Sequence, residues 1–213
     1  MLSTVQIVTP PATEPLSLDL IRQHCRIDQI ADDELLSGYA RAARSMAEAY
    51  LGRVLITQTL MWTVTPESAL RPSWHFLRGA MLLPRSPVQS ISSVTILDQR
   101  GNSTTIFPAT LPIIPPAQLI GYRADLAHSP ARIYVGPSTI LSDGRELRCI
   151  DLECVQVTFV AGYGGDATTI PQPILDAILL YSGFLYEHRG DGGADMPKAA
   201  EWLMDPYRMM WVS

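Results

Sequence analysis

The sequence predicts an α+β protein in which a helical scaffold carries an inserted block of antiparallel strands. Apolar residues recur at helical spacing over 16–53 and again over 171–204. Between these segments, over 54–160, apolar and polar residues alternate as they do in half-buried strands. Helices and strands do not alternate along the chain, which argues against a parallel sheet. Residues 1–15, rich in Pro and Thr, are expected to form an extended arm, and residues 205–213 a C-terminal tail.

Two helices are predicted in the first helical segment. Ser17 is a suitable N-cap for the first helix. The second helix begins at Asp32 or Asp33, where acidic side chains complement the helix dipole. It ends at Gly52, because glycine is favoured just beyond a helix. Its apolar stripe is predicted to consist of Leu35, Tyr39, Ala43, Met46 and Tyr50.

The inserted block opens with a strand, "VLITQTLMWTV" (54–64), in which apolar and polar residues are expected to face opposite ways. One face is predicted to carry Ile56, Leu60, Trp62 and Val64, and the other Thr57, Thr59, Met61 and Thr63. "SVTILDQRGNSTTIF" predicts a hairpin that turns at 98–102. "ARIYVG" and "ECVQVTFVAG" are further predicted strands. The stretch 108–130 holds five prolines, too many for a central strand, and is expected to be an ordered loop or an interface segment.

Helical spacing returns after residue 170. "PQPILDAILLYSGFLYEH" carries one apolar stripe, and Leu175, Leu179 and Phe184 widen it beyond what one neighbouring element would cover. The Gly-rich stretch 189–195 ends this helix, and "PKAAEWLM" predicts a short further helix. The stripe is predicted to consist of Ile174, Ala177, Ile178, Tyr181 and Leu185.

A glycine-rich turn, with Gly162, Gly164 and Gly165, joins the last strand to this long helix. The turn fits the relaxed dinucleotide fingerprint G-x-G-x-x-A. In that fingerprint the glycines open the helix directly, whereas here residues 168–171 intervene and no second parallel strand follows. We therefore expect a structural turn with positive φ at one or more glycines, and no cofactor.

Composition argues against several classes of function. The net charge is −5, and Lys198 is the single lysine among 16 basic residues, which disfavours nucleic-acid binding as the main task. No apolar run approaches the ~18 residues of a membrane span, and the N-terminus does not resemble a signal peptide. The three cysteines lack the spacing of a metal site and are expected as free thiols. The motifs of common hydrolases and metal sites are absent from the sequence, so we expect no catalytic residues.

The C-terminal tail is rich in aromatic residues and methionines. Two interpretations are open. The tail could fold back onto the protein's own core, or it could anchor a partner, since Trp, Tyr, Met and Arg are enriched where interfaces bind most strongly. The candidate anchors are Tyr207, Arg208, Met209, Met210 and Trp211.

Three stretches together resemble the phage head–tail connector (adaptor) proteins. "LSLDLIRQHCRID", followed by the acidic helix start at Asp32 and Asp33 and the helix exit "YLGRVLI", resembles the opening of that family. "LPRSPVQSISSVTILDQRG" (83–101) resembles its strand entry, and "VTFVAGYGGDATTIPQPILDAILL" (157–180) its helix entry. The three stretches occur in the family's order and span nearly the whole chain.

This resemblance implies a structural virion protein of long-tailed phages or gene transfer particles, made in the host cytoplasm, and not an enzyme. It implies a ring, typically of twelve copies, that lies beneath the portal protein and receives the tail-side stopper (head-closure) protein. DNA would pass through without sequence-specific binding, and no membrane is involved. The C-terminal anchors would contact the portal. Two alternatives stay open: a DNA-packaging or assembly factor that is absent from the mature particle, and a small nucleotide-binding enzyme.

Overall fold

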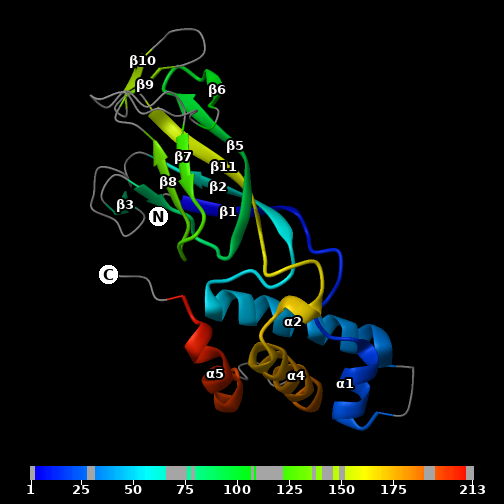
Figure 1. The fold of residues 1–213 in the computed structure, drawn as a ribbon. Helices are drawn as coiled ribbons and strands as arrows, with labels where there is room; N and C mark the ends of the chain where they lie inside the picture. Colours follow the sequence, from blue (N-terminus) through cyan, green and yellow to red (C-terminus); the bar gives the residue numbers. More distant parts are fainter. Residues whose placement is uncertain are drawn as a thin grey trace. The chain divides into compact units, whose positions relative to one another are not determined.

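The structure, a computed structural model, confirms the α+β class (Figure 1). The described residues form two compact units. The β unit comprises residues 1–10, 58–161 and 210–213, and the helical unit comprises residues 11–57 and 162–209. Within these units the structure describes residues 3–27, 32–65, 76–77, 80–106, 108, 122–135, 138–140, 146–148, 152–189 and 195–209.

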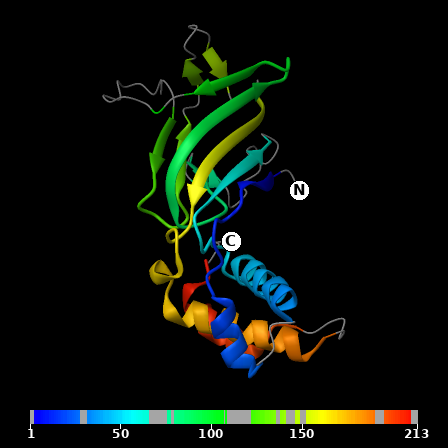
Figure 2. The same ribbon diagram turned by 90° about the vertical axis from the view of Figure 1, so that its right-hand side faces the viewer.

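The β unit contains a five-stranded antiparallel sheet in the order β1-β2-β11-β5-β6 (Figures 1 and 2). The alternation predicted for the second of these strands is confirmed, because Leu60, Trp62 and Val64 are buried and the residues between them are half-buried. The strands are β1 (Ser3–Thr9), β2 (Gln58–Val64), β5 (Val88–Asp98), β6 (Ser103–Ile106) and β11 (Leu152–Ala161).

Strand β1 lies in the segment that was expected to be an extended arm. It pairs with β2 from Ser3, opposite Val64, to Thr9, opposite Thr59, and so forms one edge of the sheet. Ile7 is 60% exposed on this edge strand. The backbone of this segment is extended, as the sequence indicated, but much of it is hydrogen-bonded into the β unit.

The predicted hairpin is formed by β5 and β6. The Asp98 carboxylate accepts hydrogen bonds from the backbone N–H groups of Arg100 and Asn102, at 2.9 and 2.8 Å. Gly101 has a φ of 82°, a value that glycine adopts without steric cost. Local hydrogen bonds of this kind explain why "DQRGN" could be recognised as a turn from its residue types alone.

A second, four-stranded sheet has the order β3-β4-β8-β7, and β9 pairs with β10. Strand β7 (Tyr122–Asp125) lies within the Pro-rich stretch 108–130, which was expected to be an ordered loop or an interface segment. It occupies the edge of its sheet, where prolines in the flanking chain remove no hydrogen bond from a central strand. The bounds are β3 (Phe76–Leu77), β4 (Ala80–Leu82), β7 (Tyr122–Asp125), β8 (Arg132–Val135), β9 (Ser138–Ile140) and β10 (Glu146–Arg148).

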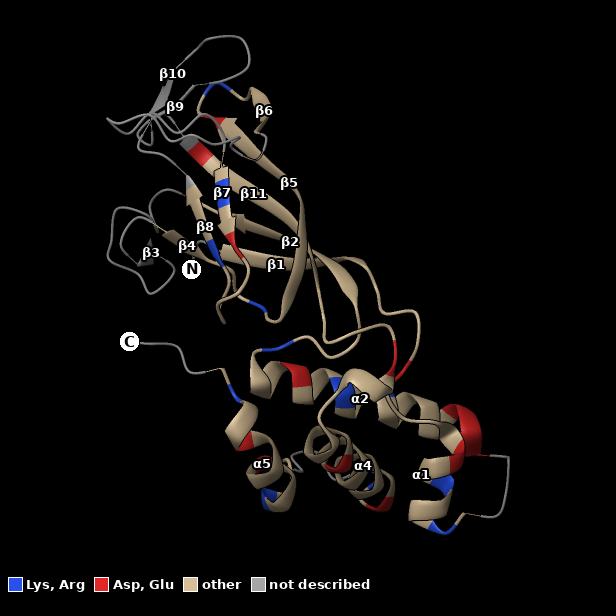
Figure 3. Cartoon of the chain, in the orientation of Figure 1, with Lys and Arg blue, Asp and Glu red and all other residues tan. Residues whose placement is uncertain are grey.

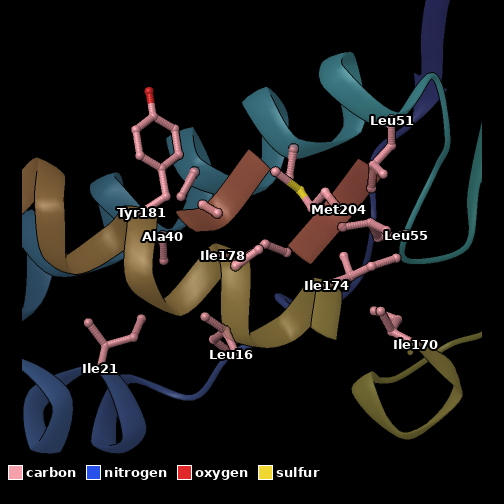
Figure 4. Packing of buried hydrophobic residues seen from close by; sticks show 14 of the residues in the cluster. Leu16, Ile21, Ala40, Leu51, Leu55, Ile170, Ile174, Ile178, Tyr181 and Met204 are labelled. Atoms are coloured by element: carbon pink, nitrogen blue, oxygen red, sulfur yellow. The ribbon is translucent and has the colours of Figure 1, made fainter. Parts of the chain in front are cut away.

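The helical unit is organised around α4, which contacts α1, α2 and α5. Its predicted stripe is buried at Ile174, Ala177, Ile178 and Tyr181, whereas Leu185 is half-buried. Figure 4 labels Ile174, Ile178 and Tyr181 among the packed side chains of this core. Three neighbouring helices explain why the apolar surface of α4 is wider than one contact requires. The elements are α1 (Leu18–Cys25), α2 (Asp33–Leu51), η3 (Ala167–Thr169), α4 (Gln172–Glu187), α5 (Lys198–Met204) and η4 (Asp205–Tyr207).

The face that α2 buries differs from the predicted stripe. Of the predicted residues, Leu35 is 39% exposed and Met46 is 49% exposed. The buried stripe is shifted by one residue over most of its length, because small alanines allow the close approach of α4. It consists of Leu36, Ala40, Ala43, Ala47 and Leu51. Alanine carries a weaker apolar signal than Leu or Met, so the sequence pattern favoured the wrong face.

The predicted ends of the two N-terminal helices are confirmed. The Ser17 side chain accepts a hydrogen bond from the Leu20 N–H at 3.2 Å, so Ser17 is the N-cap of α1. Gly52 ends α2 with a φ of 67°, and its N–H bonds back to the carbonyl of Ala49. Of the three cysteines, Cys25 and Cys154 are free thiols, and Cys149 lies outside the described residues.

Candidate interaction sites

The glycine-rich turn packs against residues 55–57 of the helical unit. Gly162 has a φ of 138°, and a Cβ atom placed on it would lie 2.6 Å from the backbone nitrogen of Thr57. A Cβ on Gly164 would lie 2.5 Å from the hydroxyl oxygen of Thr169. A Cβ on Gly165 would meet nothing within 4 Å. Two of the three glycines are therefore required by close packing, and the third is not.

Three backbone amides at or beside this turn have partners within the protein. The Tyr163 N–H donates to the Leu55 carbonyl at 3.0 Å, and the Thr57 N–H donates to the Gly164 carbonyl at 2.8 Å. The Thr168 N–H, which opens η3, donates to the Asp166 carboxylate at 2.8 Å. A bound phosphate would need such amides, and the Asp166 carboxylate would repel it. The geometry favours a turn that joins parts of the protein.

Residues 205–209 pack against the C-terminal end of α2. The Arg53 Nε donates to the Tyr207 carbonyl at 2.6 Å, and the Arg208 guanidinium carbon lies 4.8 Å from the centroid of the Tyr50 ring. Met209 is 5% exposed. The described part of the predicted tail, residues 205–209, therefore packs on the helical unit. This agrees with the interpretation that the tail folds back onto the protein's own core.

The candidate anchors differ in their surroundings. Tyr207 is half-buried, Arg208 is exposed and Met209 is buried. Met210 and Trp211 lie outside the described residues. The Tyr50 hydroxyl donates to the Asp205 carboxylate, which raises the pKa of Tyr50. Among the described anchors, Arg208 offers the most accessible side chain.

The acidic start of α2 is tied to its neighbouring helices. Arg22 of α1 donates from Nε and an Nη atom to the Asp33 carboxylate, at 2.7 and 2.5 Å. These bonds hold the pKa of Asp33 below its usual value. Asp32 accepts from the Tyr186 hydroxyl of α4 at 2.7 Å and from Arg189 at 3.3 Å. The acidic cluster at residues 32–34 thus joins α1, α2 and the end of α4, and this contact is structural.

Charged side chains are unevenly distributed over the elements. Figure 3 shows them on α1 and α2, whereas β1, β2 and β5 carry almost none. Within the parts of the chain that the structure describes, no group of three or more His, Cys, Asp or Glu side chains is placed to hold a metal ion. No helix among those same residues has the length and apolar character that a membrane span requires.

The sequence prediction missed a groove on the helical unit between the chain before α1, α1 itself and the first half of α4. Its volume is about 450 Å³, within the size range of ligand pockets. Arg44 holds Glu14 at its border, with Nε and Nη2 at 2.7 and 3.3 Å from the carboxylate. The extra apolar residues of α4, Leu175 and Leu179, were the signal that could have revealed it. The lining consists of residues 14–17, Leu20, Ala167, Gln172, Leu175, Asp176 and Leu179.

On α5 a large aromatic side chain is left uncovered. Trp202 is 71% exposed, the highest exposure of any large apolar side chain among the described residues. Lys198, one helical turn earlier, is also exposed and forms no ion pair within the described part of the chain. The opposite side of α5 packs against the core through Ala200 and Met204. Trp202 and Lys198 therefore form an exposed pair on α5, one helical turn apart.

Comparison with known proteins supports an assignment to one family. Residues 15–105 match the family described as "Phage gp6-like head-tail connector protein". This range includes α1, α2 and the strands β2 to β5, and it ends within β6. Comparison with curated proteins gives no significant match.

Solved structures share the fold of nearly the whole chain. One chain in "Virion of native gene transfer agent (GTA) particle" has a TM-score of 0.69 and 22% identity. Chains in "Neck of empty GTA particle computed with C6 symmetry" and "Neck of native GTA particle computed with C12 symmetry" have TM-scores of 0.68 and 0.67, and identities of 24% and 22%. In each case 99% of this chain and 97% of the other chain are covered.

The resemblance that the sequence motifs indicated is thereby confirmed. The matched residues carry two of the three quoted stretches, and the likeness in fold extends over the third. The predicted class of protein, a structural head–tail connector of the virion, is confirmed with it. Residues 15–105 thus match the gp6-like head–tail connector family, and the GTA chains share the fold of nearly the whole chain.

Proposed function

We propose that copies of this protein form a closed ring at the head–tail junction of a tailed phage or a gene transfer particle. The ring joins the portal protein to the tail-side stopper protein and extends the channel for DNA. The observation that carries this proposal is the match of residues 15–105 to head–tail connectors, together with a fold shared over 99% of the chain with GTA neck and virion chains. The sixfold and twelvefold symmetry named for the neck structures supports a ring of twelve copies.

The proposed role is structural and involves no catalysis and no cofactor. The glycine-rich turn supports this view, because the Tyr163 and Thr168 amides donate to the protein's own carbonyl and carboxylate oxygens. A net charge of −5 suits a channel through which DNA must slide, since DNA adheres to dense Lys and Arg. A ring with this charge would not bind a particular DNA sequence.

Contact with the portal is assigned to the C-terminal segment, residues 207–211. Arg208 is exposed, and arginine pairs with carboxylates in two-pronged hydrogen bonds at interfaces. Tyr207 and Met209, on either side of Arg208 in the sequence, pack on the helical unit and would hold the backbone of Arg208 in place. The portal would therefore meet a segment whose start is fixed by the protein's own core.

Composition of mature particles tests the proposal. Particles purified from a producing strain are expected to contain this chain in stoichiometry with the portal, and imaging is expected to show a ring of it between portal and tail. If the chain were present in immature heads but absent from mature particles, the DNA-packaging or assembly factor would be the correct function. If it were absent from both, the connector role itself would be wrong.

A further inference from the structure

The helical unit carries a groove and a projecting side chain on two different sides. The groove lies at α1 and α4, and Trp202 lies on α5. Figures 1 and 2 show α1 and α5 on opposite sides of α4, and α4 contacts both of them. A contact that repeats around a rotation axis needs two different surfaces of this kind on each copy.

The groove has the chemistry to receive an indole and a cation. Leu20, Leu175 and Leu179 supply apolar surface to the groove. Leu20 is 41% exposed, so part of this apolar surface is open to a partner. Asp176 is exposed between the two α4 leucines and accepts a hydrogen bond from Gln172 at 2.8 Å. Glu14 is already paired with Arg44, which also pairs with Glu48, so Asp176 is the carboxylate of the lining that a cation from outside can reach.

The exposed pair on α5, Trp202 and Lys198, complements both the apolar surface and the negative charge of the groove. Trp202 offers a large apolar ring with one N–H donor, a residue type that dominates the energetics of many interfaces. Lys198 is the single lysine of the chain and lies one turn from Trp202. A lysine opposite Asp176 gives the charge complementarity that fixes the register of two surfaces.

We propose that Trp202 of one copy inserts into the α1–α4 groove of the next copy, with Lys198 paired to Asp176 of that copy. This contact would be the interface between neighbouring copies in the ring, so the proposal rests on the proposed function. Both surfaces belong to the same helical unit, so each copy donates its tryptophan to one neighbour and receives one from the other. The contact leaves the C-terminal segment free to meet the portal.

Photo-crosslinking tests the contact directly. Trp202 is replaced by the photoreactive residue p-benzoylphenylalanine, the particles are purified and irradiated, and the crosslinked peptides are identified by mass spectrometry. The expected product joins two copies of this chain and carries the adduct within residues 172–179. An adduct to a different protein, or to another region of the same chain, overturns the proposal. Met46, which is 49% exposed on α2, is the matched position for the control label.

Charge reversal tests the pairing without relying on the label. Lys198→Glu and Asp176→Lys are each expected to weaken self-association by about tenfold or more, and the double variant, in which every copy carries both changes, is expected to recover it. Trp202→Ala is expected to weaken it by about thirtyfold, and Met46→Ala to leave it unchanged. Circular dichroism is used to verify that each variant is folded. Failure of the double variant to recover association argues against the pairing.

The two proposals fail in different ways. If the chain is present in the particles as a ring but gives no adduct within 172–179, the groove contact is wrong and the connector function stands. If the chain is absent from the particles, the connector function is wrong. Irradiation of concentrated purified protein then decides whether the groove contact between copies exists.

Discussion

The backbone N–H of Met209 donates a hydrogen bond to the carbonyl oxygen of Leu51, 2.8 Å away. Leu51 is the last residue of α2, where a helix leaves carbonyl oxygens without partners inside the helix. The C-terminal segment satisfies one of these oxygens and buries the Met209 side chain in the same contact. A residue that sequence composition offered as a portal anchor thus contributes to the stability of the helical unit.

The first prediction concerns the stability that Met209 supplies. Met209→Ala is expected to lower the free energy of unfolding by about 2 kcal/mol, because it removes a buried thioether side chain and leaves a cavity. Met46→Ala, at an exposed position on α2, is the control and is expected to change it by less than about 0.5 kcal/mol. Urea denaturation followed by helical circular dichroism measures both. Equal stability of the two variants would show that Met209 is not part of the core.

The second prediction separates the glycines of the turn. Gly162→Ala is expected to destabilise the protein by about 1–3 kcal/mol, because the new Cβ would lie 2.6 Å from the Thr57 nitrogen and φ is positive. Gly165→Ala is expected to be neutral or to stabilise by up to about 1 kcal/mol, because its Cβ meets nothing within 4 Å. Thermal unfolding of the two variants beside the wild type measures the difference.

The third prediction uses the same thermal assay to test for a nucleotide site. ATP, GTP or NAD, each added with Mg²⁺, is expected to leave the melting temperature of the wild type unchanged. A ligand that binds the folded state raises the melting temperature by an amount that grows with the ratio of ligand concentration to Kd. A rise that Gly162→Ala or Gly165→Ala abolished would support the nucleotide-binding enzyme and contradict a purely structural turn.

The fourth prediction concerns the pH dependence of the pair that joins α1 to α2. The Arg22 guanidinium holds the pKa of the Asp33 carboxyl below its usual value. Because the folded pKa lies below the unfolded pKa of about 3.9, the pair stabilises the protein above about pH 4. That contribution is lost as the pH falls through the folded pKa.

Asp33→Asn should therefore be less stable than the wild type at pH 7, and this difference in stability should shrink progressively as the pH falls below about 4. Asp19→Asn is the control, because Asp19 contacts the same Arg22 but its side chain is 78% exposed. It is expected to have the smaller effect at pH 7. A difference between Asp33→Asn and the wild type that did not shrink as the pH fell below about 4 would show that the pair does not act through its charge.

Much of the fold could be predicted because residue types at helix ends and the spacing of large apolar residues agreed with the packing in the structure. Ser17 and Gly52 mark helix ends through hydrogen bonds made within a few residues, so their residue types suffice. Strand β2 was recognised because its buried face carries large residues such as Trp62. The stripe of α4 was recognised for the same reason.

The parts that sequence did not reveal depend on partners distant along the chain. The buried face of α2 is set by alanines that fit against α4, and an alanine gives little signal until its neighbour is known. Segment 3–9 becomes a strand because β2 offers it a row of hydrogen-bonding groups. The groove combines residues near 14–20 with residues near 167–179, so no local pattern could define it.

The last prediction tests contact with the portal through the C-terminal segment. Removal of residues 210–213 leaves the Leu51–Met209 hydrogen bond and the contacts of Tyr207 in place, so the shortened protein is expected to fold. It is nevertheless expected to join portal-bearing heads at least about tenfold less well, because Trp211 and Met210 are among the proposed anchors. Arg208→Glu is expected to have a similar effect, since it places a negative charge at the accessible anchor.

Heads made without this protein, mixed with purified variants and recovered by sedimentation, measure the binding. Arg100→Glu, at the exposed β5–β6 turn, is the charge-matched control and is expected to bind heads as the wild type does. Trp202→Ala separates the two surfaces, because it should weaken the contact between copies and leave the portal contact of a single copy intact. A shortened protein that still sediments with heads would move the portal contact elsewhere, and the edge strand β1 with its exposed Ile7 would be the next surface to test.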